Sequence, residues 1–143
     1  LNPVFTNGLV ITGSPTGELK GLDPRDGSVR RQYPVQALSQ PLLRGEAIIV
    51  GDMDGTVSFL DLQGKVLKRA QVSEWPINQL VWWKDHIVTV NLKGEVFALD
   101  PLSLSKVDEF LLGHDQSAVF GDVTSDDSGL GMLTSRNRLF YFQ

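Results

Sequence analysis

The 143-residue chain contains no cysteine and only two histidines, His86 and His114. Without cysteine it has no disulfide, no thiolate nucleophile and no cysteine-based zinc site. Two isolated histidines give no metal-ligand spacing, and structural hydrogen bonding is their expected role. No serine lies in a G-x-S-x-G pattern, and no glycine loop of the phosphate-binding type occurs. We therefore expect a protein that is not an enzyme and that holds no metal or cofactor.

Clustered positive charge and long apolar runs are also missing. The net charge is −4 and basic residues occur in pairs at most, so no nucleic-acid partner is expected. The longest apolar runs, such as "AIIV" and "LVWW", are far too short to cross a bilayer, so we expect no transmembrane segment. No helical period of useful length is present, which favours an all-β chain.

What the sequence does contain is a repeat of about forty residues. Four stretches align, each with two β-rich runs around a polar turn: "LVITGSPTGELKGLD", "AIIVGDMDGTVSFLD", "IVTVNLKGEVFALD" and "GMLTSRNRLFYFQ". The turn glycines Gly17, Gly55 and Gly94 are 38 and 39 residues apart, and glycine supplies the positive φ that such turns need. A period near forty made only of strands is typical of β-propeller blades.

The second strand of each repeat carries apolar residues on both of its faces. Its first position holds Leu19, Val57, Val96 and Leu139, and its fourth position holds Leu22, Leu60, Leu99 and Phe142. Side chains alternate along a strand, so the two columns point to opposite faces. Burial on both faces is expected of a blade that packs between two neighbours.

These patterns predict an all-β protein, a single-domain β-propeller or part of one, with about 3.5–4 four-stranded antiparallel blades. The expected blades are 3–40, 41–76, 77–116 and an incomplete 117–143. Single-chain propellers usually have four to eight blades, and open faces at both ends would expose apolar surface. We favour completion of the ring by further blades of a longer chain, or by a second copy, over a closed four-bladed ring.

The stretch "GDMDGTVSFLD" raises the question of a calcium loop, because Asp52 and Asp54 alternate before a glycine. An EF-hand loop needs further oxygen ligands and a glutamate at its twelfth position. Counted from Asp52, that position is Gln63, and the equivalent turns "SPTG" and "NLKG" contain no acid. A tight turn capped by aspartate is the better interpretation.

The first three repeats resemble the PQQ-like β-propeller repeat, most fully in "IIVGDMDGTVSFLDLQGKVL". That stretch is similar to a blade of the propeller lipoprotein of the bacterial outer-membrane β-barrel assembly machinery, or of quinoprotein dehydrogenases. The family's usual tryptophan after the turn glycine is replaced by Gln32-Tyr33 and Arg69-Ala70. For the enzymes, the resemblance implies a quinone over a vicinal disulfide, with calcium and a catalytic aspartate. The chain lacks the cysteines, so a quinoprotein-type enzyme or small-molecule sensor is kept only as the alternative.

The last repeat resembles a WD repeat, with Gly113-His114, the "SDDSG" turn and a final strand. Asn137 stands in that family's aspartate slot and Phe142 in its tryptophan slot. The resemblance implies a structural role for the histidine. The two resemblances agree on a propeller and leave the compartment open: the cell envelope for the bacterial lipoprotein, the cytoplasm for a WD protein.

A scaffold that binds another protein or an extended peptide is the function these features favour. Three tryptophans lie in "SEWPINQLVWWKDH", and tryptophan is enriched at binding hot spots. Trp82 and Trp83 point to opposite faces of a strand, while Trp75 lies in the loop joining two blades, where packing between blades is its alternative role. Blade-joining loops and second-strand turns share one face of a propeller. We nominate for partner binding on that face Trp75, Asp52, Asp54, His114 and Arg136.

Overall fold

The computed structural model describes residues 3–143 apart from 15, 38, 112–118, 126–128 and 135–138. The described residues form fifteen strands in four antiparallel sheets, each with its strands in chain order. The first sheet contains β1 (Val4–Thr6), β2 (Leu9–Gly13), β3 (Glu18–Leu22) and β4 (Val29–Gln36). The second contains β5 (Leu42–Arg44), β6 (Ala47–Gly51), β7 (Thr56–Leu60) and β8 (Val66–Gln71). The third contains β9 (Ile77–Trp83), β10 (His86–Asn91), β11 (Glu95–Leu99) and β12 (Lys106–Leu111), and the fourth contains β13 (Val119–Ser125), β14 (Leu130–Thr134) and β15 (Leu139–Phe142).

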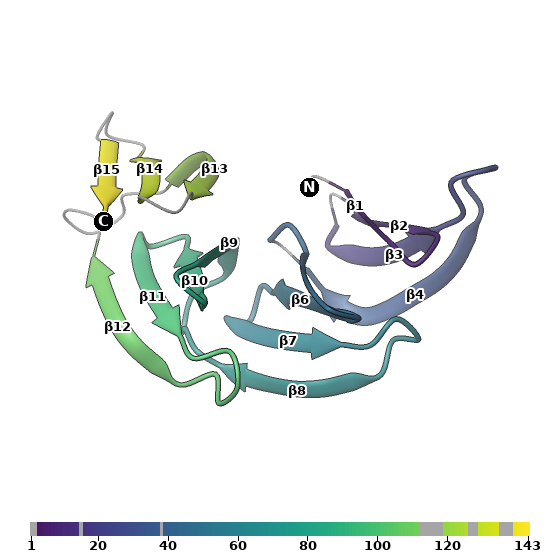
Figure 1. The fold of residues 1–143 in the computed structure, drawn as a ribbon, viewed down its shortest axis with the longest axis horizontal. Coiled ribbons are helices and arrows are strands. Elements are labelled where there is room, and N and C mark those ends of the chain that lie inside the picture. Colours follow the sequence, from purple (N-terminus) through teal and green to yellow (C-terminus); the bar gives the residue numbers. More distant parts are fainter. Residues whose placement is uncertain (1–2, 15, 38, 112–118, 126–128, 135–138) are drawn as a thin grey trace.

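The four sheets follow one another around an open arc, with the first and fourth sheets at its two ends (Figure 1). The last strands of the first three sheets, β4, β8 and β12, lie along the outer side of the arc. Sheets of three or four antiparallel strands arranged in this way are the blades of a β-propeller, or of part of one. The predicted fold class is therefore confirmed.

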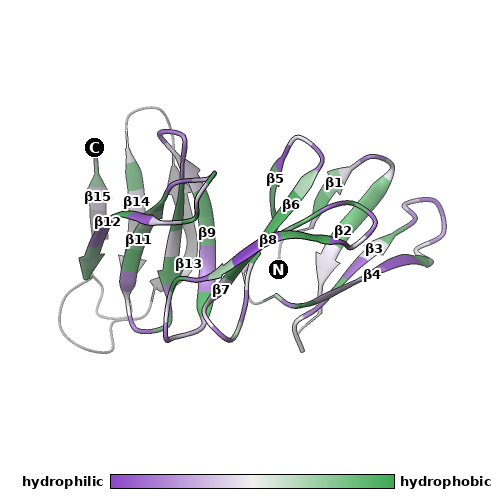
Figure 2. Ribbon diagram, turned by 90° about the horizontal axis from the view of Figure 1, so that it is seen from below, coloured by the Kyte–Doolittle hydropathy of each residue, from purple (hydrophilic) through white to green (hydrophobic). Residues whose placement is uncertain are grey.

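Packing between sheets explains why apolar residues occupy both faces of the central strands. In β6, Ile48 and Val50 are fully buried against the first sheet, together with Ile11 and Leu19. Ile49, one residue along, is equally buried on the opposite face. That face belongs to a second core, which the second sheet shares with the third. The second sheet is thus enclosed on both sides, and green hydrophobic segments run through its strands in Figure 2.

The two columns of apolar residues separate between these cores as the sequence predicts. Leu60 packs toward the preceding sheet, and Val57, three residues earlier, packs toward the following one. Leu99 and Val96 repeat this division in the third sheet. The second and third sheets therefore each present one column to the blade before them and the other column to the blade after them.

Trp82 and Trp83 point to opposite faces of β9, as expected for neighbours in a strand. Trp82 packs on the core between the second and third sheets, and its Nε1 donates a hydrogen bond to the Leu43 carbonyl at 3.2 Å. Trp83 packs beside Leu130 of the fourth sheet. Stacked blades provide a core on each face of the strand, so both indoles pack against apolar residues.

The linker between the second and third sheets is held against the β6–β7 turn. The Gly55 carbonyl accepts hydrogen bonds from the backbone N–H groups of Val72 and Ser73, at 3.0 and 3.1 Å. The Ile77 N–H donates to the Asp52 carbonyl at 3.0 Å. Gly55 has φ +79°, and a Cβ there would overlap the Ser73 carbonyl. Glycine is therefore required at this position twice over, for its backbone angle and for the close approach of the linker.

Replacing Gly55 with alanine should lower the free energy of unfolding far more than the same change at Gly8. Gly8 has a similar φ of +77° but open space around its Cα, so Gly8→Ala should cost only about 1–2 kcal/mol for the left-handed conformation. Gly55→Ala adds the overlap with Ser73 and should cost about 3 kcal/mol or more. Urea unfolding of both variants checks this. Equal losses would contradict the close packing of linker and turn.

Candidate functional site

The structure places Trp75, Asp52 and Asp54 at one end of the sheets, which we call the linker face. It consists of the turn 52–55, the turn 91–94 and the linker 72–76. The hydrogen bond from the Ile77 N–H to Asp52, and another from Leu92 to the Pro76 carbonyl at 3.0 Å, join these three segments. His114 and Arg136, the two other nominated residues, lie outside the described residues.

Asp52 is the cap of its turn. Its side chain is buried, and Oδ1 accepts hydrogen bonds from the backbone N–H groups of Asp54 at 2.9 Å and Thr56 at 3.0 Å. This is the Asx-type geometry in which a short carboxylate replaces a backbone acceptor. The turn interpretation of "GDMDG" is therefore confirmed. Asp54, the next residue but one, is exposed at the turn's tip.

Trp75 is fixed at its backbone and open at its side chain. The Ser73 hydroxyl donates to the Trp75 carbonyl at 2.8 Å and accepts from the Trp75 N–H at 2.9 Å. The same hydroxyl accepts from Nδ2 of the buried Asn91 at 2.8 Å. The indole remains 44% exposed, with Lys93 Nζ lying 4.8 Å from its ring centroid. A polar network thus fixes the backbone that carries this aromatic side chain at the surface.

A cleft of ≈ 520 Å³ opens beside this indole, and we call it the Trp75 cleft. It lies between the end of β8 and the third sheet. Lys106 Nζ lies 3.9 Å from the centroid of the Phe97 ring on its wall. The lining therefore combines aromatic surface with charges of both signs, and consists of Gln71, Val72, Ser73, Glu74, Trp75, Lys93, Glu95, Phe97 and Lys106.

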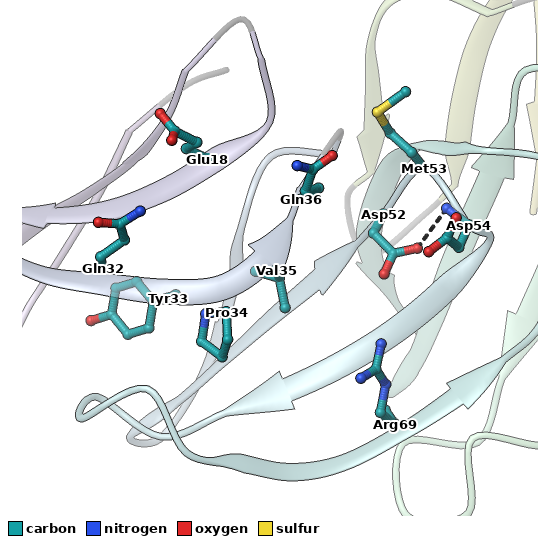
Figure 3. A pocket seen from close by; sticks show the side chains of 10 residues that line it. All are labelled: Glu18, Gln32, Tyr33, Pro34, Val35, Gln36, Asp52, Met53, Asp54 and Arg69. Carbon is teal, nitrogen blue, oxygen red and sulfur yellow. Dashed lines mark hydrogen bonds between the residues drawn. The ribbon is translucent and has the colours of Figure 1, made fainter.

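A second cleft, of ≈ 420 Å³, occupies the equivalent place between the first and second sheets (Figure 3). Asp52 and Asp54 lie on one side, with Arg69 of β8 below them, and Glu18 lies across the opening. Met53, at the tip of the turn, is 51% exposed. The turn 52–55 therefore stands between two clefts, one on each side, and the nominated residues Asp54 and Trp75 line different ones.

A third cleft, of ≈ 560 Å³, lies at the opposite end of the sheets. It contains His86, which begins β10 after the Lys84-Asp85 turn. Trp82 and Arg44 line it too, with the guanidinium 5.5 Å from the indole centroid. Because β10 runs from His86 to Asn91, this cleft and the linker face are at opposite ends of the strand.

Asp23, Asp61 and Asp100, which each follow the second strand of a repeat, lie in the turns at this far end. Asp61 Oδ1 accepts from the N–H groups of Gln63 and Lys65, and Asp100 Oδ1 does so from Leu102 and Ser103. Asp23 is buried and is also paired with two arginines. Its carboxylate accepts from Arg25 Nε and Nη2 and from Arg30 Nη2, at 3.2, 3.0 and 3.0 Å. Hydrogen bonds from Arg25, above all, hold the pKa of Asp23 well below its usual range.

Sequence reasoning missed Asn91 and Ser73, although the signal for Asn91 was present. Asn91 occupies the turn slot of Asp52, and its Oδ1 accepts from the N–H groups of Lys93 and Glu95, both at 3.0 Å. The alignment of "GDMDG" with "VNLKG" contains this equivalence. An asparagine has additional N–H donors, and Nδ2 of Asn91 donates to the Ser73 hydroxyl in the linker. No pattern in the sequence marks Ser73 itself.

Among the described residues, no group of three or more histidine and carboxylate side chains is placed to hold a metal ion. The same part of the chain contains no helix that is long and apolar enough to cross a membrane.

Comparisons with known proteins identify the fold. No protein-family model matches the chain, and no curated protein matches its sequence. The computationally designed proteins Ika8 and Ika4 each superimpose with a TM-score of 0.79 at 20% identity over 98% of this chain. BamB from Moraxella catarrhalis superimposes with a TM-score of 0.72 at 22% identity over 94% of it. The chain spans 44% of Ika8, 88% of Ika4 and 42% of BamB. These likenesses support the propeller architecture.

The paired state of Asp23 should make folding sensitive to acid. A carboxyl group whose pKa is lower in the folded than in the unfolded chain stabilises the fold above its unfolded pKa, near 3.9, and this stabilisation is lost as the pH falls. We expect Asp23→Asn to lower the free energy of unfolding at pH 7, and the difference from the native chain to shrink between about pH 4 and 2. Arg25→Gln removes hydrogen bonds to the Asp23 carboxylate, so it should also make the free energy of unfolding less dependent on pH over this range. Urea titrations across this range check both, and a difference that does not change with pH would contradict the pairing.

Proposed function

We propose that the protein is a non-catalytic scaffold that binds an extended segment of a partner protein on its linker face, with Trp75 as the central contact. The observation that carries this is the state of Trp75, which combines a fixed backbone with a half-exposed indole at the mouth of a cleft. Large aromatic side chains in such positions dominate binding energies at protein interfaces. A backbone already fixed at this position also reduces the ordering that binding of the partner costs.

The surroundings of Trp75 favour a peptide-like occupant. Two lysines, Lys93 and Lys106, and two glutamates, Glu74 and Glu95, line the Trp75 cleft beside the aromatic rings. Such a surface accepts both charged side chains and the polar backbone of an extended segment. In this proposal Asp52 is a positioning residue that shapes the turn, and Asp54 contacts the partner from the turn's tip. His114 and Arg136 remain part of the proposed surface through their places in the last repeat.

We also propose that the first three repeats are PQQ-like and that the last is WD-like. Both proposals rest on the residues quoted from the sequence, and they favour a subunit of a larger assembly over a free-standing binder. The alternative, a quinoprotein-type enzyme or small-molecule sensor, would show itself as cofactor absorbance in the purified protein.

A library of displayed linear peptides, panned against the purified chain, provides the test. We expect enriched peptides whose binding is lost in Trp75→Ala, with Kd raised by about thirtyfold or more, the effect of removing a hot-spot side chain. Asn91→Ala, which frees the Ser73 hydroxyl from its donor, should weaken binding by a smaller factor. Fluorescence titration of one synthetic peptide from the selection measures both.

Leu102→Ala is the matched control, since Leu102 is 75% exposed but lies at the opposite end of the sheets. It should leave the Kd unchanged. Peptides that bind Trp75→Ala as tightly as the native chain would overturn the proposed site, and so would a failure to enrich any sequence.

A further inference from the structure

The first sheet carries an uncovered row of apolar side chains that crosses all four of its strands. Phe5 of β1 pairs with Val10 of β2, Val10 with Leu22 of β3, and Leu22 with Val29 of β4. Phe5 is 65% and Val29 is 55% exposed, while Val10 and Leu22 are half-buried between them. We call this row the leading face, because it lies on the side of the first sheet away from the second.

The equivalent rows of the next two sheets are covered. In the second sheet the paired residues are Leu43, Ile48, Leu60 and Val66, and they pack against the first sheet. In the third sheet the row begins Trp82, Ile87 and Leu99, and it packs against the second sheet. Ile48, Leu60, Ile87 and Leu99 are all fully buried. The molecule therefore shows twice what covers a row of this kind: the opposite face of another blade.

The other end of the arc presents such an opposite face. In the fourth sheet Leu130 pairs with Phe142, and both pack toward the third sheet. The neighbouring pair, Gly131 and Tyr141, therefore lies on the far side. It is equivalent to Ile49 and Phe59, which bury that side of the second sheet against the third. Phe59 is 5% exposed and Tyr141 is 56% exposed. We call this second surface the trailing face.

We propose that the leading face of one chain packs on the trailing face of a second copy, and the reverse, so that two chains close one ring. Each junction would repeat the blade-to-blade packing that already occurs within the chain. Such contacts are heterologous, joining two different surfaces, and heterologous contacts form a closed ring when the rotation between copies allows it. Figure 1 shows the geometry that this requires, an arc whose first and last sheets lie at its ends.

The solved structures favour a second copy as the occupant. Ika8 and Ika4 match the same 98% of this chain equally well, yet it spans 44% of one and 88% of the other. The Ika8 chain is therefore twice as long as the Ika4 chain (88/44 = 2). The same arrangement of sheets thus occurs as part of a long chain and as most of a chain close to this one in length. A second copy of the chain would supply both faces, so it could cover the leading face and the trailing face at once.

Light scattering on a size-exclusion column tests the proposal with the 143-residue chain. We expect a mass of twice 15.8 kDa, which falls toward the single-chain value on dilution. A well-folded chain that has the single-chain mass at every concentration would overturn the proposal. That result would leave the two faces to further blades of a longer protein or to a different partner.

A matched pair of substitutions links the association to the leading face. Val29→Glu should raise the dimer Kd by about thirtyfold or more, and Val107→Glu should leave it unchanged. Both valines are on the outer strand of a sheet and are 55% and 53% exposed, but the third sheet, which carries Val107, has a neighbour on both sides. Equal effects of the two substitutions on the dimer Kd would overturn the assignment of the leading face as the dimer contact. Circular dichroism confirms that each variant is folded.

Mixing two variants tests the direction of the contact. Phe5→Glu blocks the leading face and Tyr141→Glu blocks the trailing face, so each variant alone should be monomeric. A mixture retains one native junction, between the trailing face of the first and the leading face of the second, and should form a heterodimer. No association in the mixture would contradict a leading-to-trailing contact and indicate that like faces pair instead.

Discussion

Stacking of sheets that are apolar on both faces is the constraint on which the rest of this structure depends. A single antiparallel sheet needs only one buried face, but β6 and β10 carry apolar side chains on both. Neither strand can be solvated on one side without exposing at least one buried isoleucine or valine side chain. Each blade therefore needs a blade before it and a blade after it. The arc, the cores between sheets and the exposed rows at its two ends all follow from this requirement.

The linker face follows from the same constraint. Blades that stack closely confine the linker 72–76 between the β6–β7 turn of its own sheet and the β10–β11 turn of the next, so the linker must bond to both turns. Gly55 permits the approach, and Asn91 and Ser73 satisfy the polar groups that it buries. Trp75 is held at the surface because its neighbours in the chain are fixed in this way. A structural necessity of the fold thus places an exposed aromatic side chain on a fixed backbone.

Much of the fold could be predicted from the sequence because its causes are local. Turn glycines at a fixed spacing give the repeat, and the columns containing Val57 and Leu60 give the two buried faces. The candidate site was harder to predict from the sequence. The exposure of Trp75 and the link from Asn91 to Ser73 depend on how a linker packs against a turn in the next blade, which no local pattern encodes. The same limit applied to Trp83, whose core is supplied by a different sheet.

Burial of both faces of the central strand is the claim that can be tested most directly. Ile48 and Ile49 are adjacent in β6, fully buried and in different cores. The account predicts that Ile48→Ala and Ile49→Ala each lower the free energy of unfolding by about 2–5 kcal/mol, the usual cost of removing a buried isoleucine side chain. Urea unfolding of the two variants measures both. If one substitution were nearly neutral, β6 would have a solvated face, and the stacked-blade account would be wrong.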